Sequence, residues 1–197
     1  MQNTKYCLAI TALLLAIPAA RADGFQGLYF GARIGENSSR FSGTMVGFNN
    51  SESNVNLNER LAPTTGLEIG YNSASGNYIV GLDGFVDFNG RVGHAVRVDG
   101  APVYMETHYG STVYGADLKL GIVSGYWMPY LKLGYGTGRA DGDLSGQGNG
   151  AHFGLGAEFM ITPRASMAGE LSDFTAKSDG GKLHNTNFTI SINFFLE

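Results

Sequence analysis

The sequence predicts an all-β protein, an eight-stranded antiparallel up-and-down transmembrane β-barrel, on three observations. Apolar and polar residues alternate with a period of two in eight stretches, starting at Leu28. Large apolar residues take one parity, while the glycines and nearly every charge take the other. The connections between the stretches alternate between short and long. Because successive side chains of a strand point to opposite faces, each stretch is a strand with one apolar face and one small or charged face.

The first stretch illustrates the rule, with Leu28, Phe30 and Ile34 on one face and Tyr29 and Arg33 on the other. The seventh stretch shows the weakest alternation. The eight strands are expected at Gly27–Gly35, Thr64–Tyr71, Tyr78–Phe88, Tyr104–Ile122, Tyr130–Thr137, Ala151–Ile161, Ser166–Phe174 and Asn187–Leu196.

The connections indicate which ends of the strands meet which compartment. Three are short and rich in turn-forming residues: Asn72–Asn77, Val123–Pro129 and Thr162–Ala165. Four are longer and polar: Glu36–Arg60, Asn89–Val103, Gly138–Gly150 and Thr175–Thr186. Short periplasmic turns and long external loops are typical of membrane barrels, so both chain ends are expected on the short-turn side.

A soluble barrel with an apolar ligand cavity is the alternative, and its polar face would meet water. Only 15% of the residues are charged, which is too few for a water-facing surface. The last strand is amphipathic, and aromatic residues recur near strand ends, as in the girdles of membrane barrels. These are Tyr71, Tyr78, Trp127 and Phe194 at the short-turn end, and Phe88, Tyr114, Tyr135 and Phe188 toward the long loops. The apolar face is therefore expected to meet lipid.

Residues 1–22 are expected to be a cleaved export signal, with Lys5 before an apolar run, Leu8–Ile17, and the small-x-small site Ala20-Arg21-Ala22. An uncleaved anchor is the alternative, but the run is too short to span a bilayer as a helix. Cleavage would leave residues 23–197 as one barrel domain without the only cysteine, Cys7, and so without a disulfide. That domain has 11 basic and 17 acidic residues, a net charge of −6, which argues against a nucleic-acid partner.

The barrel assignment places nine charged side chains inside a lumen just wide enough for side chains. Isolated buried charges are costly, so we expect a structural lattice of salt bridges; a proton or ion path is the alternative. The acids outnumber the bases, so water, tyrosine or protonation must satisfy some carboxylates. The nine are Arg33, Lys119 and Lys132 with Glu68, Asp83, Asp87, Asp117, Glu158 and Glu170.

An enzyme is the main rival class, because some barrels of this size modify lipid A with a serine, a histidine and an acid. The base must lie within hydrogen-bond reach of the nucleophile. His108 is three residues from Ser111 and hence on the other face, His152 lies among glycines, and His94 and His184 fall in predicted loops. The histidines are also too scattered for a metal site. No catalytic, cofactor-binding or metal-ligating residue is predicted.

Two of the predicted loops carry candidate contact residues. The first holds Phe41, Met45, Val46 and Phe48, which either form an exposed contact surface or pack together on strands that extend beyond the membrane. The second holds a weak basic patch for acidic glycans or lipopolysaccharide phosphates, diluted by Asp99. Its residues are Arg91, His94 and Arg97.

Three segments resemble the small outer-membrane barrels of the opacity-protein and OmpA/OmpX-like superfamily. The segment 24–35, GFQGLYFGARIG, resembles its first strand; 129–136, PYLKLGYG, its fifth; and 154–159, GLGAEF, its sixth. The similarity covers the whole predicted mature chain, but its motifs are loose. Members usually end on an aromatic residue that the barrel-assembly machinery reads, whereas this chain ends Phe194-Phe195-Leu196-Glu197.

The resemblance implies a Gram-negative outer-membrane protein with a structural or surface-interaction role, such as adhesion, host contact or envelope integrity. The partners it implies are outer-membrane lipids and lipopolysaccharide, the assembly machinery through the last strand, and host surface or matrix molecules through the loops. No enzyme activity and no cofactor are expected. A lipid-A-modifying enzyme and a narrow ion channel are the alternatives.

Overall fold

The computed structural model describes residues 22–46, 52–58, 61–98, 101–142, 146–178 and 181–196. A short 3-10 helix, η1 (Ala22–Phe25), precedes nine strand segments. The predicted export signal lies outside the described residues except for Ala22. The strand segments are β1 (Gly27–Val46), β2 (Glu52–Asn58), β3 (Leu61–Ser75), β4 (Tyr78–Val98), β5 (Ala101–Ile122), β6 (Trp127–Gly142), β7 (Gly146–Thr162), β8 (Ala165–Ser178) and β9 (Gly181–Leu196).

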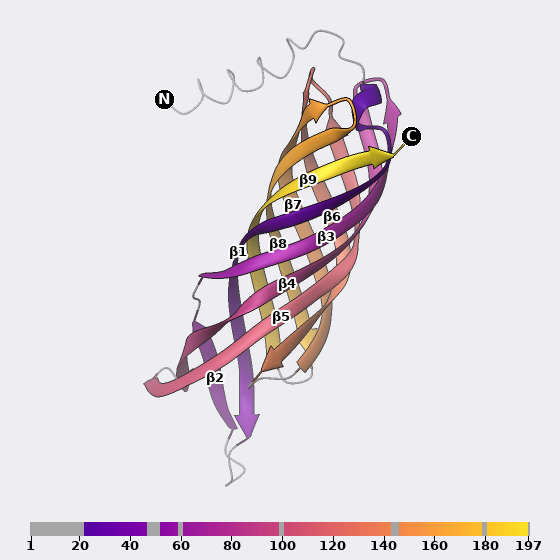
Figure 1. Ribbon diagram of the computed structural model, residues 1–197. Helices are drawn as coiled ribbons and strands as arrows, with labels where there is room; N and C mark the ends of the chain where they lie inside the picture. The colour runs from indigo at the N-terminus through magenta and orange to yellow at the C-terminus, as the bar shows by residue number, and fades with distance from the viewer. Residues whose placement is uncertain are drawn as a thin grey trace, which may run out of the picture.

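The strands form a closed antiparallel barrel, as the sequence predicts. Each of β3 to β8 pairs with the next strand along the chain, and β9 pairs with β1 to close the sheet. β2 and β3 share one position in the barrel, because both pair with β1 on one side and with β4 on the other. Nine segments therefore occupy eight positions (Figure 1).

Three tight turns join strands at one end of the barrel. Gly76 and Gly125 have φ angles of 61° and 64° in two of these turns, a conformation that glycine adopts without steric cost. The end of β9 and η1 lie at this same end, and the hairpin of β1 and β2 projects from the opposite end (Figure 1). The predicted arrangement is confirmed for the short turns and for the two ends of the described barrel, η1 and the end of β9.

The four long connections were expected to be polar loops, and here the expectation is wrong. β1 continues to Val46, β4 to Val98, and β7 begins at Gly146, so hairpins replace most of the loops. For the first connection, the backbone of Phe41, Met45 and Val46 lies in β1, which is the strand-extension alternative. Their side chains, residue 48, and the side chains of Arg91, His94 and Arg97 lie outside the described part of the structure, as does Asp99.

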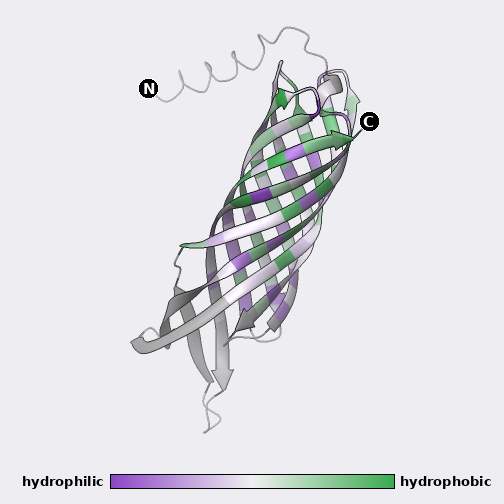
Figure 2. Ribbon diagram, viewed as in Figure 1, coloured by the Kyte–Doolittle hydropathy of each residue, from purple (hydrophilic) through white to green (hydrophobic). Residues whose placement is uncertain are grey.

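The two faces of the strands are assigned as predicted. Along β9, Phe188, Ile190, Ile192, Phe194 and Leu196 are exposed, and the residues between them are buried. Hydrophobic and hydrophilic residues accordingly alternate along the ribbons (Figure 2). All eight girdle aromatics face outward. A rise of about 3.4 Å per residue and a strand tilt of about 40° give these β9 positions a span of roughly 20 Å across a membrane, close to the apolar band of about 25 Å.

The aromatic girdle at the long-hairpin end, which includes Phe88 and Phe188, is called the upper girdle here, and 'above' means farther from the short turns. Beyond the upper girdle, the polarity of the two faces changes. Outward positions above Phe188 and Leu171 become polar, as at Thr186, Asp173 and Lys182. Inward positions near this level include Val113, Phe174, Ala176 and Leu183, which form an apolar cluster with Phe85, three residues before Phe88 on β4. A strand that leaves lipid for water needs a polar outer surface, so this change marks the extracellular edge of the membrane-spanning part.

No helix among the described residues is long and apolar enough to cross a membrane.

Candidate functional site

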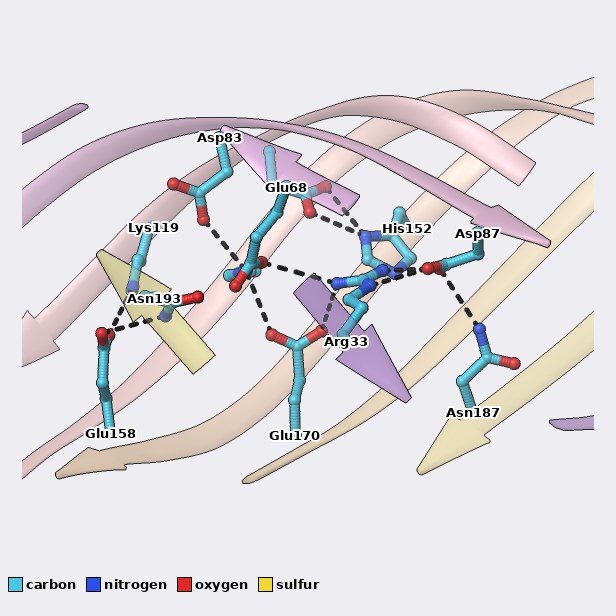
Figure 3. A network of polar contacts seen from close by, with 12 residues as sticks. Arg33, Glu68, Asp83, Asp87, Lys119, His152, Glu158, Glu170, Asn187 and Asn193 are labelled. Carbon is cyan, nitrogen blue, oxygen red and sulfur yellow. Dashed lines mark hydrogen bonds and ion pairs between the residues drawn. The ribbon is translucent and has the colours of Figure 1, made fainter. Parts of the chain in front are cut away.

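The lumen is the most highly charged region of the described structure. All nine charged side chains that the sequence assigns to the interior are buried there: Arg33, Glu68, Asp83, Asp87, Asp117, Lys119, Lys132, Glu158 and Glu170. They come from β1 and from β3 to β8 and point into the lumen, as Figure 3 shows for those that it labels. The inward assignment of the nine residues is therefore confirmed.

Lys132 and Arg33 are the centres of one connected lattice. The Lys132 ammonium group lies 3.0 Å from Glu68, 3.0 Å from Asp83 and 3.1 Å from Glu170. The Arg33 guanidinium group donates two hydrogen bonds to Asp87, at 2.6 and 2.5 Å, and lies 3.6 Å from both Glu68 and Glu170. Glu68 and Glu170 thus link the two cations, and the lattice joins walls that are far apart in sequence.

A second pair lies nearer the short-turn end. Lys119 donates a 2.8 Å hydrogen bond to Glu158, which also accepts hydrogen bonds from Ser166 and, at 3.1 Å, from Asn193. The Lys119 ammonium group lies 5.0 Å and 4.6 Å from two tyrosine rings, those of Tyr29 and Tyr130. Cation–π contacts of this kind, together with a fully hydrogen-bonded carboxylate, offset part of the cost of burial.

Tyrosine and histidine supply the partners that the excess of acids requires. Tyr29 donates a hydrogen bond to Asp83, and Tyr130 donates one of 3.0 Å to Glu170. His152, which the sequence places only among glycines, lies 2.9 Å from Asp117 through Nδ1, and its ring packs 4.4 Å from that of Phe85. The sequence predicted tyrosine as a kind of partner but identified neither Tyr29 nor Tyr130, and it did not predict His152. The available signal was parity, because all three residues share the face of the charges.

Glycines share that face because the large inward side chains need the room. A Cβ built on Gly70 would lie 2.7 Å from the ring of Tyr29, and one built on Gly156 would lie 2.5 Å from the hydroxyl of Tyr130. Both distances are too short for a real contact. The glycines on strands β3 and β7 therefore allow the two tyrosines to reach the carboxylates.

Neutral polar side chains form a second layer nearer the long hairpins. Asn89 donates a 2.9 Å hydrogen bond to Ser111, and Asn185 donates one of 3.2 Å to the same hydroxyl. Ser111 is on β5 and Asn185 on β9, so this contact crosses the lumen. Ser39 extends the layer to β1 through a 2.7 Å hydrogen bond to Asn185. This polar layer was not predicted from the sequence.

Apolar clusters close the lumen on both sides of the charged lattice. At the short-turn end the cluster comprises Phe25, Tyr29, Ile79, Val123, Met128, Tyr130, Met160, Ala168 and Phe195. Helix η1 is held in this end by a 2.9 Å hydrogen bond from Asn72 to the carbonyl oxygen of Phe25. The cluster around Phe174 fills the other side. Together with the polar layer, these clusters leave the lattice enclosed by side chains.

The chemistry open to this interior is limited. Among the described residues, no group of three or more His, Cys, Asp or Glu side chains is placed to hold a metal ion. Three strong cations face six carboxylates, and the lattice gives each carboxylate an ion pair or a hydrogen bond. Such an arrangement suits a structural network better than a binding site.

One further polar group lies outside the barrel. His184, expected in a loop, lies in β9, where its Nδ1 is 2.9 Å from the Thr175 hydroxyl and its Nε2 is 3.1 Å from Asp173. Thr186 also donates a 3.2 Å hydrogen bond to Asp173. This threonine is not apparent from the sequence, where only serines near the histidines suggest a nucleophile, because a cross-strand partner is defined by the register of β8 on β9.

The comparisons with known proteins agree with this architecture. A family model described as the outer membrane protein beta-barrel domain matches residues 7–194. The neisserial surface protein A structure is similar with a TM-score of 0.59 and 14% identity, covering 87% of this chain and 98% of that one. OprG of Pseudomonas aeruginosa is similar with a TM-score of 0.56 and 14% identity, covering 89% of this chain and 100% of that one. No curated protein sequence matches. The chain therefore belongs to the outer membrane protein beta-barrel domain family.

Proposed function

We propose that this chain is a closed barrel of the Gram-negative outer membrane that acts through its extracellular hairpins, in surface contact or envelope integrity. The observation that carries the proposal is the enclosed lumen. Ion pairs centred on Lys132 and Arg33, and the Ser111 to Asn185 contact, connect opposite walls. A barrel without an open passage through its lumen can contact partners only through its outer surfaces.

The hairpins are the surfaces that such a role would use. The strands continue beyond the upper girdle and carry the backbone past the apolar belt, to Val46 in β1 and Val98 in β4. Strand pairing holds these extensions, and so they present a firmer surface than free loops would. We propose host surface or matrix molecules as their partners, and the assembly machinery as the partner of β9 during insertion.

The test is a binding assay on cells that express the native protein or a shortened hairpin. Ser42 and Asn56 are cross-strand partners, so replacing residues 43–55 by Asn-Gly preserves the register of β1 and β2. Cells with the native protein should bind immobilised fibronectin, laminin or serum proteins more than vector-only cells, and the shortened variant should lose this gain. The control variant replaces residues 141–145 by Asn-Gly between the partners Ala140 and Gly146. It distinguishes the contribution of the β1–β2 hairpin to binding from that of the β6–β7 hairpin. Binding equal to that of vector-only cells would contradict the proposal.

An enzyme of the outer leaflet is the second candidate, and the group of Thr175, His184 and Asp173 favours it. The hydroxyl and the carboxylate contact opposite ring nitrogens, which is the order that a general base requires. Two features argue for a surface polar network instead. Asp173 is shared with Thr186, and its strand is paired on both sides, so the backbone N–H groups beside it take part in strand pairing and do not form an oxyanion hole.

Lipid A composition separates the two candidates. Cells with the native protein and cells with His184→Asn should show the same lipid A acylation by mass spectrometry. A loss of acyl chains that depends on His184 would establish an enzyme.

A further inference from the structure

A basic patch, consisting of Arg40, Lys177, Lys182 and His184, lies on the outer surface just above the membrane-spanning belt. The four residues come from the adjacent strands β1, β8 and β9 and share the outward parity. Lys182 is the cross-strand partner of Lys177, and His184 is the partner of Arg40. Strand pairing therefore brings four basic side chains together from three separate parts of the sequence.

The two lysines of the patch are a like-charged pair. Side chains directly opposite each other in an antiparallel sheet lie about 5 Å apart at Cβ, and like charges there are destabilising. Within the described part of the chain, no carboxylate pairs with Lys177 or Lys182; Asp173, the nearest acid on this face by register, contacts His184 instead. A paired strand that carries this repulsion suits a surface whose charge is neutralised by an anionic ligand.

The residues beneath the patch have the polarity of a lipid interface. Toward the short-turn end of β9, Thr186 lies two residues after His184, and Phe188 of the upper girdle lies two residues after Thr186. The partners of Phe188 are Leu171 on β8 and Glu36 on β1, and Ile34 and Ile190 pair directly below. Read toward the periplasm, this surface is thus basic, then polar with Thr186 and Asp173, and then apolar apart from Glu36. A phosphorylated lipid of the outer leaflet has the same order.

Among the residues whose side chains the structure describes, the basic charge on the outer surface lies mainly on one side of the barrel. Above the girdle, the described outward positions of β3, β4 and β5 are uncharged; they include Leu61, Pro63, Gly90 and Thr112. On the other strands the only other described basic residue above the girdle is Arg139 on β6. Within the described part of the outer surface, the patch is therefore the one place where basic residues of three neighbouring strands gather.

We propose that the basic patch binds the phosphate groups of a lipopolysaccharide molecule packed against β8, β9 and β1. Its acyl chains would lie along Leu171, Phe188, Ile190 and Ile34. A soluble polyanion would use the charges but not the apolar surface beneath them, which is why the lipid is the favoured ligand. The inference rests on the outer-membrane location within the proposed function, and it names the surface and the chemical group involved.

The test measures binding of lipopolysaccharide to the refolded full-length protein in detergent micelles at low salt. A lysine near an anionic lipid surface contributes a factor of about five in affinity, so Lys177→Gln/Lys182→Gln should weaken binding by roughly 25-fold. Lys177→Arg/Lys182→Arg should restore it, and Arg164→Gln, in the periplasmic turn, should leave it unchanged. Asp179, between the two lysines, is kept in every variant.

Three further arms identify the ligand. Enzymatically dephosphorylated lipopolysaccharide should bind the native protein and the glutamine variant equally, and neither inorganic phosphate nor heparin should displace the intact lipid at matched charge. Equal affinity of the native protein and the glutamine variant for intact lipopolysaccharide would overturn the proposal. Displacement by heparin as efficient as by lipopolysaccharide would overturn it as well, in favour of a soluble polyanion site. Both results would leave the binding of host molecules by the hairpins untouched.

Unfolding in the absence of lipopolysaccharide gives an independent readout. Relief of the like-charge repulsion should leave the glutamine variant as stable as the native protein or more stable. Lower stability would show that the lysines have structural partners and would contradict the argument from their repulsion.

Discussion

Single residues in the lumen are stabilised by pairing rather than by solvation. Glu158, which is fully buried, receives hydrogen bonds from Lys119, Ser166 and Asn193. Removing one member of a buried ion pair leaves the other uncompensated, and this costs more than removing both. The pair Lys119–Glu158 is suited to a direct measurement, because Lys119 has no other ion pair among the described residues.

Lys119→Met should lower the free energy of unfolding by about 3–5 kcal/mol, because Glu158 keeps its charge and loses its cation. The double variant Lys119→Met/Glu158→Gln should recover part of this loss. A double-mutant cycle by urea unfolding in lipid vesicles gives the coupling energy. Additive effects of the two changes would contradict the pairing.

A lipid-facing residue tests the other face. Leu118 is 40% exposed and lies on β5 midway between Tyr114 and Ile122, near the centre of the apolar belt. Leu118→Arg should destabilise the barrel by about 2–4 kcal/mol, since a cation near the midplane must be dehydrated or reach for an interface. Leu118→Met is the matched control and should cost little. Equal unfolding free energies in vesicles would show that this face does not meet lipid.

Parity alone assigns single residues to a face, but it does not identify their partners. The sequence placed all nine interior charges correctly, because the alternation of Lys119 with Leu118 or of Asp87 with Phe88 is local. The contacts of His152 with Asp117 and of Tyr29 with Asp83 depend on which strands face each other across the lumen. That information lies in the strand register and barrel closure, which alternation does not contain.

At the scale of the strands, the membrane boundary and the strand end are different places. The alternation of polarity stops near Phe88 on β4 and near Phe188 on β9. Strand pairing extends further, to Val98 at the end of β4 and to Gly181 at the start of β9. Apart from Tyr104–Ile122, which was expected to extend further, the predicted strands ended near the boundary, because hydrophobic periodicity reports burial and lipid contact and not backbone pairing. Above the boundary both faces contain polar residues, and so the period-two signal weakens there.

The hairpin of β1 and β2 should be dispensable for folding, because it lies beyond the belt and the charged lattice. The variant in which Asn-Gly replaces residues 43–55 should refold in detergent with β-type circular dichroism and the heat-modifiable gel mobility of a barrel. As the matched control, a deletion of two residues within β3, below the girdle, should prevent folding. Failure of the hairpin variant to refold would show that the extension contributes to the core of the fold.

At the scale of the whole molecule, the lumen is closed in layers. An apolar cluster with η1 lies at the periplasmic end, the ion-pair lattice lies at membrane depth, and the Asn and Ser layer with the Phe174 cluster follows toward the outside. An eight-stranded barrel is only wide enough for its own side chains, and here they fill it. The outer surface is thus the part of the protein available to partners.

Planar-bilayer recordings should therefore show no stable openings of porin size for the native protein. Arg33→Ala/Lys132→Ala, which removes the two cations that link opposite walls, is the comparison and should increase leakage or fail to refold. Steady large conductance of the native protein would contradict the closed lumen.

The central claim is that one face of each strand meets lipid and the other a closed interior, and spin labels along β9 test both halves at once. Single cysteines are introduced from Phe188 to Phe195 in a Cys7→Ser background, where the inward residues Thr189, Ser191 and Asn193 are small. Labels at 188, 190, 192 and 194 should be accessible to oxygen dissolved in lipid. Labels at 189, 191 and 193 should be protected from both oxygen and a water-soluble nickel chelate. Access of the chelate to these inward positions, or accessibility without a period of two, would contradict the account.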